Sequence, residues 1–313
     1  MEQIHLIDPL AAGEEERRQL VRLWEECFEA DEPYLQVYRE QMLVKSDART
    51  VVLREQGKIL GMLTLLPCSY RVEGRQLPAM YLFAVATLPE AQGKQVATRM
   101  LSWVDRFLPQ QGIEVAILAP ATESLYSFYR KRGYEDWFYR SKLTLPAGQT
   151  GQKGLVWEEI GAHPFAQQLK RLAGQDAVLW SAKELEFAEA ESRLYHGGMY
   201  RLWQDGCPVG VCNLYRYTAD KVIVKELLTE PEVCAEQLVK QICSGFEGGS
   251  IEFRLHPQLD LGQKVPAGML RFYTRERPLA SGQAYLPFIS KVRKILIISH
   301  AIHWELEHCI CYT

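Results

Sequence analysis

The spacing of apolar and polar positions along residues 14–85 predicts two helices followed by a β-meander. Apolar side chains recur at helical spacing over 14–29, and a second amphipathic segment runs to Met42. Two apolar runs, 51–54 and 59–66, flank a glycine turn, which is typical of a β-hairpin. Another turn leads into a strand over 80–85.

The pattern then changes from strand to helix twice. Apolar positions at helical spacing predict a helix from Val96 to Leu108. A strand over 114–119 follows, and then a helix over 123–132 that ends at Gly133. The first half of the chain therefore reads as a meander followed by strand, helix, strand and helix.

The second half repeats this order after a polar, glycine-bearing segment at 148–152 that suits a linker. Like the first half it begins with two helices and a hairpin, and it continues with a strand, a helix and a strand. The repeat predicts an internal duplication of the fold. Its expected elements are helices near 163–173 and 181–194, strands over 199–203, 208–215 and 221–228, a helix over 232–246 and a strand over 250–255.

Composition narrows the class of protein. The chain has 313 residues, a formal net charge of -3 and 24% charged residues, an ordinary globular balance that gives no reason to expect nucleic acid or an anionic membrane as a bulk partner. The N-terminus lacks the pattern of a signal peptide, and no stretch of about 18 apolar residues is present, so we expect a cytoplasmic protein.

Cysteine and histidine usage indicates no metal site. The eight cysteines are scattered through apolar segments, so we expect most of them to be reduced core residues. One group near the C-terminus contains ligands that zinc sites use, but its spacing matches no known template. That group consists of His300, His303, His308, Cys309 and Cys311.

The passage from strand to helix at 85–101 is the strongest candidate site. The first amides of a helix have no partner within the helix, and the helix dipole adds positive charge there, so this end favours an anion. Gly93 lets a ligand approach the backbone closely, and Lys94 adds a mobile cation.

These elements resemble the core of the GCN5-related N-acetyltransferase superfamily. Gln92 and Ala97 match the ends of the family's phosphate-binding pattern, whereas its glycine position holds Gln95. With ordinary helix-start dihedrals the Gln95 side chain can point away from the phosphate, so we expect cofactor binding to be weakened but not abolished. The second family motif, a tyrosine four residues before a glycine–aromatic pair, is intact from Tyr129 to Tyr134.

The resemblance implies two tandem acyl-CoA N-acyltransferase folds, each a mixed, mostly antiparallel α/β sheet flanked by helices. We expect a catalytic domain over 1–145, a degenerate copy over 151–290 and a C-terminal extension over 291–313. In the second copy Glu236 lies at the helix start, where a carboxylate would repel pyrophosphate.

A tandem arrangement with one degenerate copy resembles the enhanced intracellular survival family, without its sterol-carrier-like domain. The last family-like strand is expected over 284–289. That family uses the terminal carboxylate of its chain as a base, and the extension leaves this role unassigned here.

The family also implies roles for individual residues toward acetyl-CoA as co-substrate. Tyr129 would donate a proton to the departing thiolate, although its spacing also suits a core aromatic, and Tyr126 is a weaker alternative. Ser124 would contact the cofactor. The strand end, Val85, Ala86 and Thr87, would pair with the pantetheine arm. The pyrophosphate would lie on the amides of Gln92, Gly93, Lys94, Gln95, Val96, Ala97 and Thr98.

The acceptor side is less defined. Acidic residues in the first helical region would attract a cationic amine, but for each of them taken singly a solvated helix face is the favoured interpretation. The general base stays open between Glu26, Asp31 and a water-linked carbonyl. The acidic residues are Glu26, Glu29, Asp31 and Glu32.

The leading hypothesis is an acetyl-CoA-dependent N-acetyltransferase whose acceptor, a primary amine of a small molecule or peptide, attacks the thioester directly. One alternative is a non-catalytic acyl-CoA-binding or regulatory module. Another is a tandem aminoacyl or acyl transferase with a tRNA-borne donor, against which the lack of a basic stripe counts. A homo-oligomer is left open.

Overall fold

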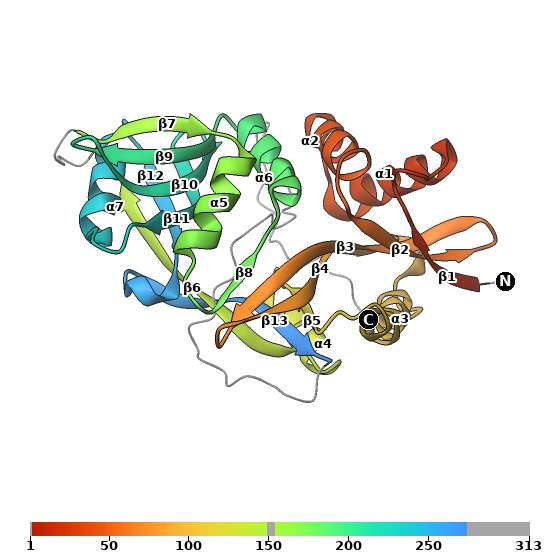
Figure 1. Ribbon diagram of the computed structural model, residues 1–313. Coiled ribbons are helices and arrows are strands. Elements are labelled where there is room, and N and C mark those ends of the chain that lie inside the picture. The colour runs from red at the N-terminus through yellow and green to blue at the C-terminus, as the bar shows by residue number, and fades with distance from the viewer. Residues whose placement is uncertain (1, 149–153, 274–313) are drawn as a thin grey trace.

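The computed structural model describes residues 2–148 and 154–273. Their strands form one continuous twisted sheet with helices on both faces, the first half at the right and the second half at the left of Figure 1. The order across the sheet is β1-β2-β3-β4-β5-β13-β6-β12-β11-β10-β9-β7, and β8 pairs with β3 outside this path.

The first half contains the predicted meander and the predicted helices. Its strands are β1 (Glu2–Ile7), β2 (Arg49–Glu55), β3 (Lys58–Val72), β4 (Arg75–Thr87), β5 (Val115–Leu118) and β6 (Glu135–Pro146). Its helices are α1 (Glu14–Phe28), α2 (Glu32–Val37), which continues as a π-turn (Tyr38–Met42), α3 (Val96–Gln110) and α4 (Glu123–Arg130). Strands β1 and β6 were not predicted.

The second half repeats this order with two differences: it has the extra strand β8 between α5 and α6, and a 3₁₀ turn (Pro257–Leu259) replaces the helix between its last two strands. Its strands are β7 (Val156–Ile160), β8 (Ala177–Leu179), β9 (Gly198–Gln204), β10 (Cys207–Thr218), β11 (Lys221–Thr229), β12 (Ser250–Leu255) and β13 (Gln263–Phe272). Its helices are α5 (Ala162–Leu172), α6 (Ala182–Leu194) and α7 (Ala235–Ser244). Helix α7 joins the parallel strands β11 and β12, just as α3 joins the parallel strands β4 and β5.

Strands β6 and β13 merge the two halves. Strand β13, from the end of the described chain, inserts between β5 and β6 and pairs antiparallel with both. Strand β6 also pairs with β12 through six residue pairs, from Ser141 to Pro146. The predicted boundary between 145 and 151 stays a prediction, and the expected strand at 284–289 and the extension at 291–313 lie outside the described residues.

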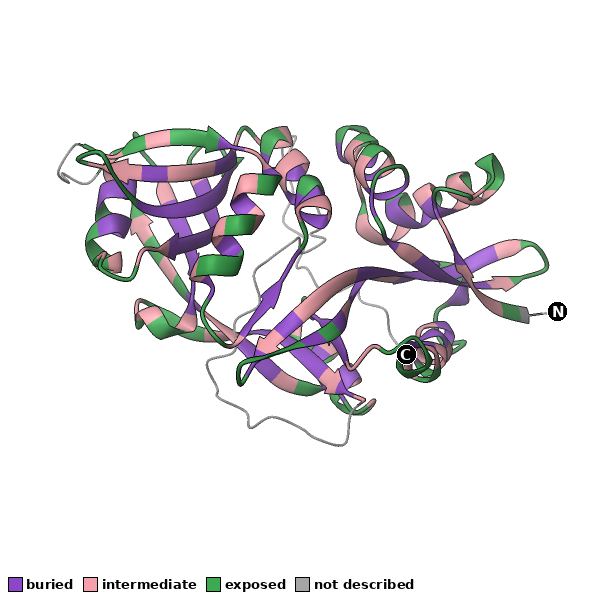
Figure 2. Ribbon diagram, viewed as in Figure 1, coloured by how far each residue is buried: buried purple, intermediate pink, exposed green. Residues whose placement is uncertain are grey.

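The core lies where helices cover the sheet, and the central strands are buried along most of their length (Figure 2). The predicted apolar faces are the buried ones. Leu20, Leu23 and Trp24 of α1 are fully buried, and so is the stripe of α3 that runs from Val96 to Leu108. Sequence periodicity therefore identified the faces of both helices correctly.

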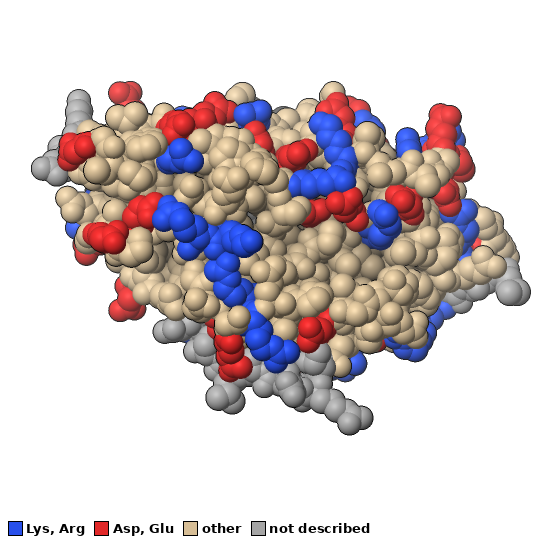
Figure 3. Space-filling model, in the orientation of Figure 1, with Lys and Arg blue, Asp and Glu red and all other residues tan. Residues whose placement is uncertain are grey.

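Surface charge is mixed on the face that Figure 3 shows. Basic and acidic side chains are interspersed, with one short band of Lys and Arg that runs from α5 toward the β3–β4 turn and is bordered by acidic residues (Figure 3). In α5, Arg171 is already paired with Glu230. The prediction that the chain has no basic stripe therefore holds on this face except for this short band.

Within residues 2–148 and 154–273, no helix is long and apolar enough to cross a membrane, and no group of three or more potential metal ligands occurs. The histidine and cysteine group at 300–311 lies outside these ranges. A cytoplasmic location stays a prediction. None of the six described cysteines forms a disulfide. Only Cys212 and Cys243 are buried, whereas Cys207 and Cys234 are exposed, so the expectation of mostly buried cysteines was wrong for the described residues.

Glu252 makes the stability of the seam between the halves depend on pH. Its buried carboxylate lies within 2.9 Å of Lys221 Nζ on β11, 3.2 Å of Arg254 Nε on β12 and 3.4 Å of Lys142 Nζ on β6. Burial alone would raise the pKa of Glu252, but the three cations outweigh burial and lower the pKa from 4.5 to about 2. The resulting stabilisation is complete above pH 4.5 and is lost as the pH falls toward 2.

We therefore expect Glu252→Gln to lower the free energy of unfolding at pH 7 by roughly 2–3 kcal/mol and to flatten its decline between pH 5 and pH 2. Urea unfolding at a series of pH values measures both effects. The exposed Glu247→Gln removes the same charge and should change neither. Equal flattening in the two variants would contradict the assignment to Glu252.

Candidate active site

Strands β4 and β5 pair for only three residues and then separate. The parallel register runs from Ala79–Val115 to Tyr81–Ile117, after which β4 continues to Thr87 without β5 as its neighbour. A cavity of about 100 Å³ lies in the gap. Its lining comes from β4 (Tyr81–Val85), from the end of β5 and the loop after it (Leu118–Ala121), from Phe28 of α1 and from Leu125 and Tyr129 of α4.

A β-bulge turns β4 at this cavity. Met62 of β3 pairs with Ala86 and Thr64 pairs with Phe83, so Ala84 and Val85 together face the single residue between them. Ala84 has a φ of 50°, in the left-handed region that a residue with a Cβ rarely adopts. The bulge interrupts the regular ladder beside the cavity, which is where an extended ligand would pair with the strand.

Tyr129 lines the cavity from the other side. Thr122 Oγ1 caps α4 by accepting from the Leu125 amide at 3.4 Å, and Tyr129 lies in the last turn with 6% of its surface exposed. Its ring packs edge-on against Tyr134, 5.7 Å between centroids. Of the predicted residues, the cavity thus brings together Val85 and Tyr129, which are 44 positions apart in the chain.

The turn after Tyr129 is supported by the second half of the chain. The Tyr134 amide donates to the Tyr129 carbonyl at 3.2 Å across Gly133, whose φ is 79°. Arg271 of β13 donates to the Arg132 carbonyl at 2.6 Å and to Asp105 Oδ2 of α3 at 2.8 Å. Strand β13 therefore fixes both the turn that holds the tyrosine motif and the helix α3.

The start of α3 departs from the expected geometry. Gln95 is the N-cap residue with φ 58° and ψ 25°, so the expectation of ordinary helix-start dihedrals was wrong. This left-handed conformation is the one a glycine adopts without cost, which gives a physical reason for glycine at this position in the family pattern. Gln95 instead holds the conformation under strain.

The predicted phosphate-binding amides divide into two groups. The Gln92 amide donates to Pro89 and the Lys94 amide to Ala91, so these two are engaged within the loop. Among residues 2–148 and 154–273, no acceptor receives the amides of the remaining five, which leaves them available to an anion. The five are Gly93, Gln95, Val96, Ala97 and Thr98.

Side chains around this helix start include two cations. Lys94 is exposed. Arg132, which was not predicted, donates from Nη2 to Thr98 Oγ1 at 2.5 Å, and its guanidinium lies 3.4 Å from the centroid of the Phe128 ring. Ser124 is exposed at the start of α4, with its hydroxyl 2.9 Å from that of Thr122, so it lies on the surface beside the cavity lining.

The acidic residues predicted near the acceptor side have mainly structural contacts. Asp31 caps α2 by accepting from the Tyr34 amide at 3.0 Å. Glu26 pairs with Arg22, and Glu32 pairs with Arg39 at 2.8 Å. The contacts of Asp31, Glu26 and Glu32 agree with the simpler interpretation as caps and surface ion pairs.

The second half has a bulge at the equivalent place, in β11, but a buried ion pair lies there instead of a cavity. Strand β11 has an extra residue, Lys225, between the pairs Asn213–Glu226 and Leu214–Val224. Lys225 is buried and forms an ion pair with Glu191 of α6, and its ammonium lies 5.2 Å from the centroid of the Tyr215 ring. At the helix start, Glu236 is present as predicted and pairs with Lys240 at 2.6 Å.

Comparison with known proteins agrees with this geometry. Residues 9–136 match the model of the acetyltransferase (GNAT) domain. These residues form a GNAT acetyltransferase domain. No curated protein matches the chain by sequence. The predicted enzyme class, N-acetyltransferase, is confirmed by the domain match.

Solved structures share the fold over both halves. A probable N-acyltransferase of unknown function from Enterococcus faecalis is 14% identical, with a TM-score of 0.66 over 87% of this chain and 73% of that one. Eis1 from Mycobacterium abscessus is 13% identical, with a TM-score of 0.63 over the same shares. A tandem GNAT protein from the clavulanic acid biosynthesis pathway is 10% identical, with a TM-score of 0.55 over 88% of this chain and 100% of that one. The predicted tandem fold class is thereby confirmed.

Relief of the strain at Gln95 provides a test of the α3 geometry. We expect Gln95→Gly to raise the free energy of unfolding by about 1 kcal/mol, because glycine adopts the left-handed conformation without a Cβ clash. Urea unfolding measures this change. Gln92 has a φ of -61°, so the matched variant Gln92→Gly should instead lose about 0.5–1 kcal/mol. Destabilisation by both substitutions would contradict the strained N-cap.

Proposed function

We propose that the GNAT domain transfers the acetyl group of acetyl-CoA to a primary amine of a small molecule or peptide. The observation that carries this proposal is the cavity between the diverging strands β4 and β5, with the bulged strand on one side and Tyr129 on the other. The free amides at the start of α3 lie beyond the end of the same strand and suit the pyrophosphate.

Each part of the donor has a matching part of the domain. The five free amides from Gly93 to Thr98 hold the pyrophosphate, and Lys94 adds a cation. The backbone at Val85, Ala86 and Thr87 pairs with the pantetheine arm, and an amide at the bulge polarises the thioester carbonyl. Ser124 contacts the cofactor from the edge of α4.

Transfer proceeds by direct attack of the neutral amine on the thioester carbon. The C–N bond forms and the C–S bond then breaks, while the amine loses one proton and the thiolate of CoA gains one. Tyr129 delivers the proton to the sulfur as the thiolate departs, because its phenol can donate a proton and the residue lines the cavity. The acetyl group leaves on the acceptor as an amide.

The second half is proposed to bind no donor. Its bulge is occupied by the buried Lys225–Glu191 pair, and the carboxylate of Glu236 lies in the first turn of α7. A negative charge at that helix start opposes phosphate binding. One acetyl-CoA site per chain follows.

Replacement of Tyr129 tests the chemical step. We expect Tyr129→Phe to lower kcat by at least roughly a hundredfold, because it removes the proton donor while keeping the ring in place. Release of the CoA thiol with a panel of primary amines measures kcat, and calorimetry should give an unchanged Kd for acetyl-CoA.

The matched variant Tyr126→Phe removes a phenol one turn earlier, from a buried side chain that is not part of the cavity lining. It should keep kcat within a fewfold of the parent. Binding of acetyl-CoA without thiol release for any amine would favour the alternative of a non-catalytic acyl-CoA-binding module. Failure of calorimetry to detect acetyl-CoA at millimolar concentration would overturn the proposal.

A further inference from the structure

Glu184, in the first turn of α6, is a buried carboxyl for which the proposed reaction has no use. Only 3% of its surface is exposed. Oε2 accepts from the Ser181 hydroxyl, whereas Oε1 is buried and has no hydrogen-bond partner among the described residues. Leaving a buried polar atom without a hydrogen bond destabilises the fold, so a function for Glu184 is worth seeking.

The position of Glu184 relates it to the cavity of the first half. Trp180 precedes it by four residues, and its ring packs on Tyr81 at 5.4 Å between centroids. Phe187 follows by three residues and packs on Phe83 at 6.1 Å. Tyr81 and Phe83 both line the cavity, and the i,i+3 spacing within α6 places Glu184 on the same face of the helix as Phe187. The carboxyl therefore lies on the face of α6 that packs against the aromatic wall.

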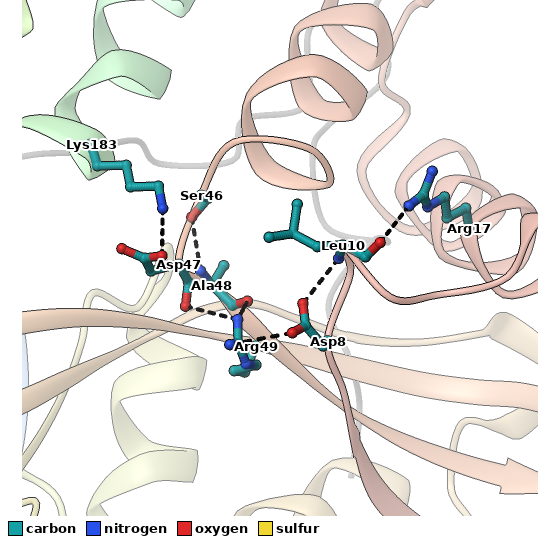
Figure 4. Close-up of polar contacts among 8 residues, drawn as sticks. All are labelled: Asp8, Leu10, Arg17, Ser46, Asp47, Ala48, Arg49 and Lys183. Atoms are coloured by element: carbon teal, nitrogen blue, oxygen red, sulfur yellow. Dashed lines mark hydrogen bonds and ion pairs between the residues drawn. The ribbon is translucent and has the colours of Figure 1, made fainter.

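The neighbouring charges leave the carboxyl largely uncompensated. Burial raises the pKa of Glu184, and the hydrogen bonds that its carboxyl accepts from the Ser181 hydroxyl and from its own backbone oppose that rise. Of the two nearby charges, Asp47 adds to the rise and Lys183 opposes it. Figure 4 shows that Lys183 points toward Asp47, with Nζ 2.5 Å from Oδ1. Glu184 also acts on the sheet that α6 covers: its negative charge contributes to the raised pKa of the Cys68 thiol in β3.

We propose that the Glu184 carboxylate, behind the wall of Tyr81 and Phe83, attracts the ammonium group of the acceptor into the cavity and so selects cationic amines. This inference rests on the proposed function and concerns its acceptor. Glu184 is a positioning residue that acts through the electric field, because a charge behind an apolar wall is screened less than one in water. The second half of the chain then supplies acceptor selectivity to the first.

The test compares acceptors of different charge. The probes are an aliphatic primary amine, which is protonated at neutral pH, and an aromatic primary amine, which is not. We expect Glu184→Gln to raise KM for the aliphatic amine by about tenfold and to leave KM for the aromatic amine and for acetyl-CoA unchanged. Glu186→Gln is the matched control, because Glu186 is an exposed carboxyl two residues further along α6 and should alter none of these values.

Glu184→Asp keeps the charge and should retain at least half of the parent's preference for the aliphatic amine. An equal rise in KM for both amines, or no rise for either, would overturn the role of Glu184, as would an Asp variant that behaves like the Gln variant. If acetyl-CoA binds and the parent protein acetylates neither amine, it is the proposed function that fails, and the inference fails with it.

Discussion

The antiparallel pairing of β13 with β5 and β6 is the interaction on which the rest of the structure depends. Strand β5 has only four residues, and one of its edges pairs with β4 for three of them before the gap at the candidate active site opens. Its other edge is covered by β13, whose paired residues lie 151 to 157 positions later in the chain, from Met269 against Leu118 to Phe272 against Val115. The same strand holds the turn after Tyr129 through Arg271. The GNAT domain is therefore completed by the second half of the molecule.

This shared sheet explains how two copies of one architecture have different properties. Both copies keep the bulge in the strand before the crossover helix. In the first copy the bulge adjoins a cavity and a helix start with free amides, whereas in the second a buried ion pair occupies it. Loss of either partner of a buried ion pair is strongly destabilising, because it leaves an uncompensated buried charge. The second copy thus serves as a support that positions β13 and α6.

The sequence predicted the features that depend on residues close together in the chain, but not those that depend on contacts between distant segments. Periodicity identified the buried face of α3 and the hairpin around Gly57, because both depend on neighbours in the chain. It did not reveal the insertion of β13, which depends on pairing between segments far apart. The left-handed conformation of Gln95 was also missed, since only the glycine in the family pattern hinted at it. No sequence pattern marked Glu184 as a candidate residue, because its relation to the cavity arises from the packing of α6 on the first half.

The most direct test is hydrogen–deuterium exchange of the full chain with and without acetyl-CoA, which reports where the donor binds. We predict slower exchange at 85–98, where the bulged strand and the free amides lie, and no change at 225–237 in the second copy. We also predict one acetyl-CoA per chain. Protection of the second copy, or protection of neither segment at saturating acetyl-CoA, would contradict a donor site in the first half alone.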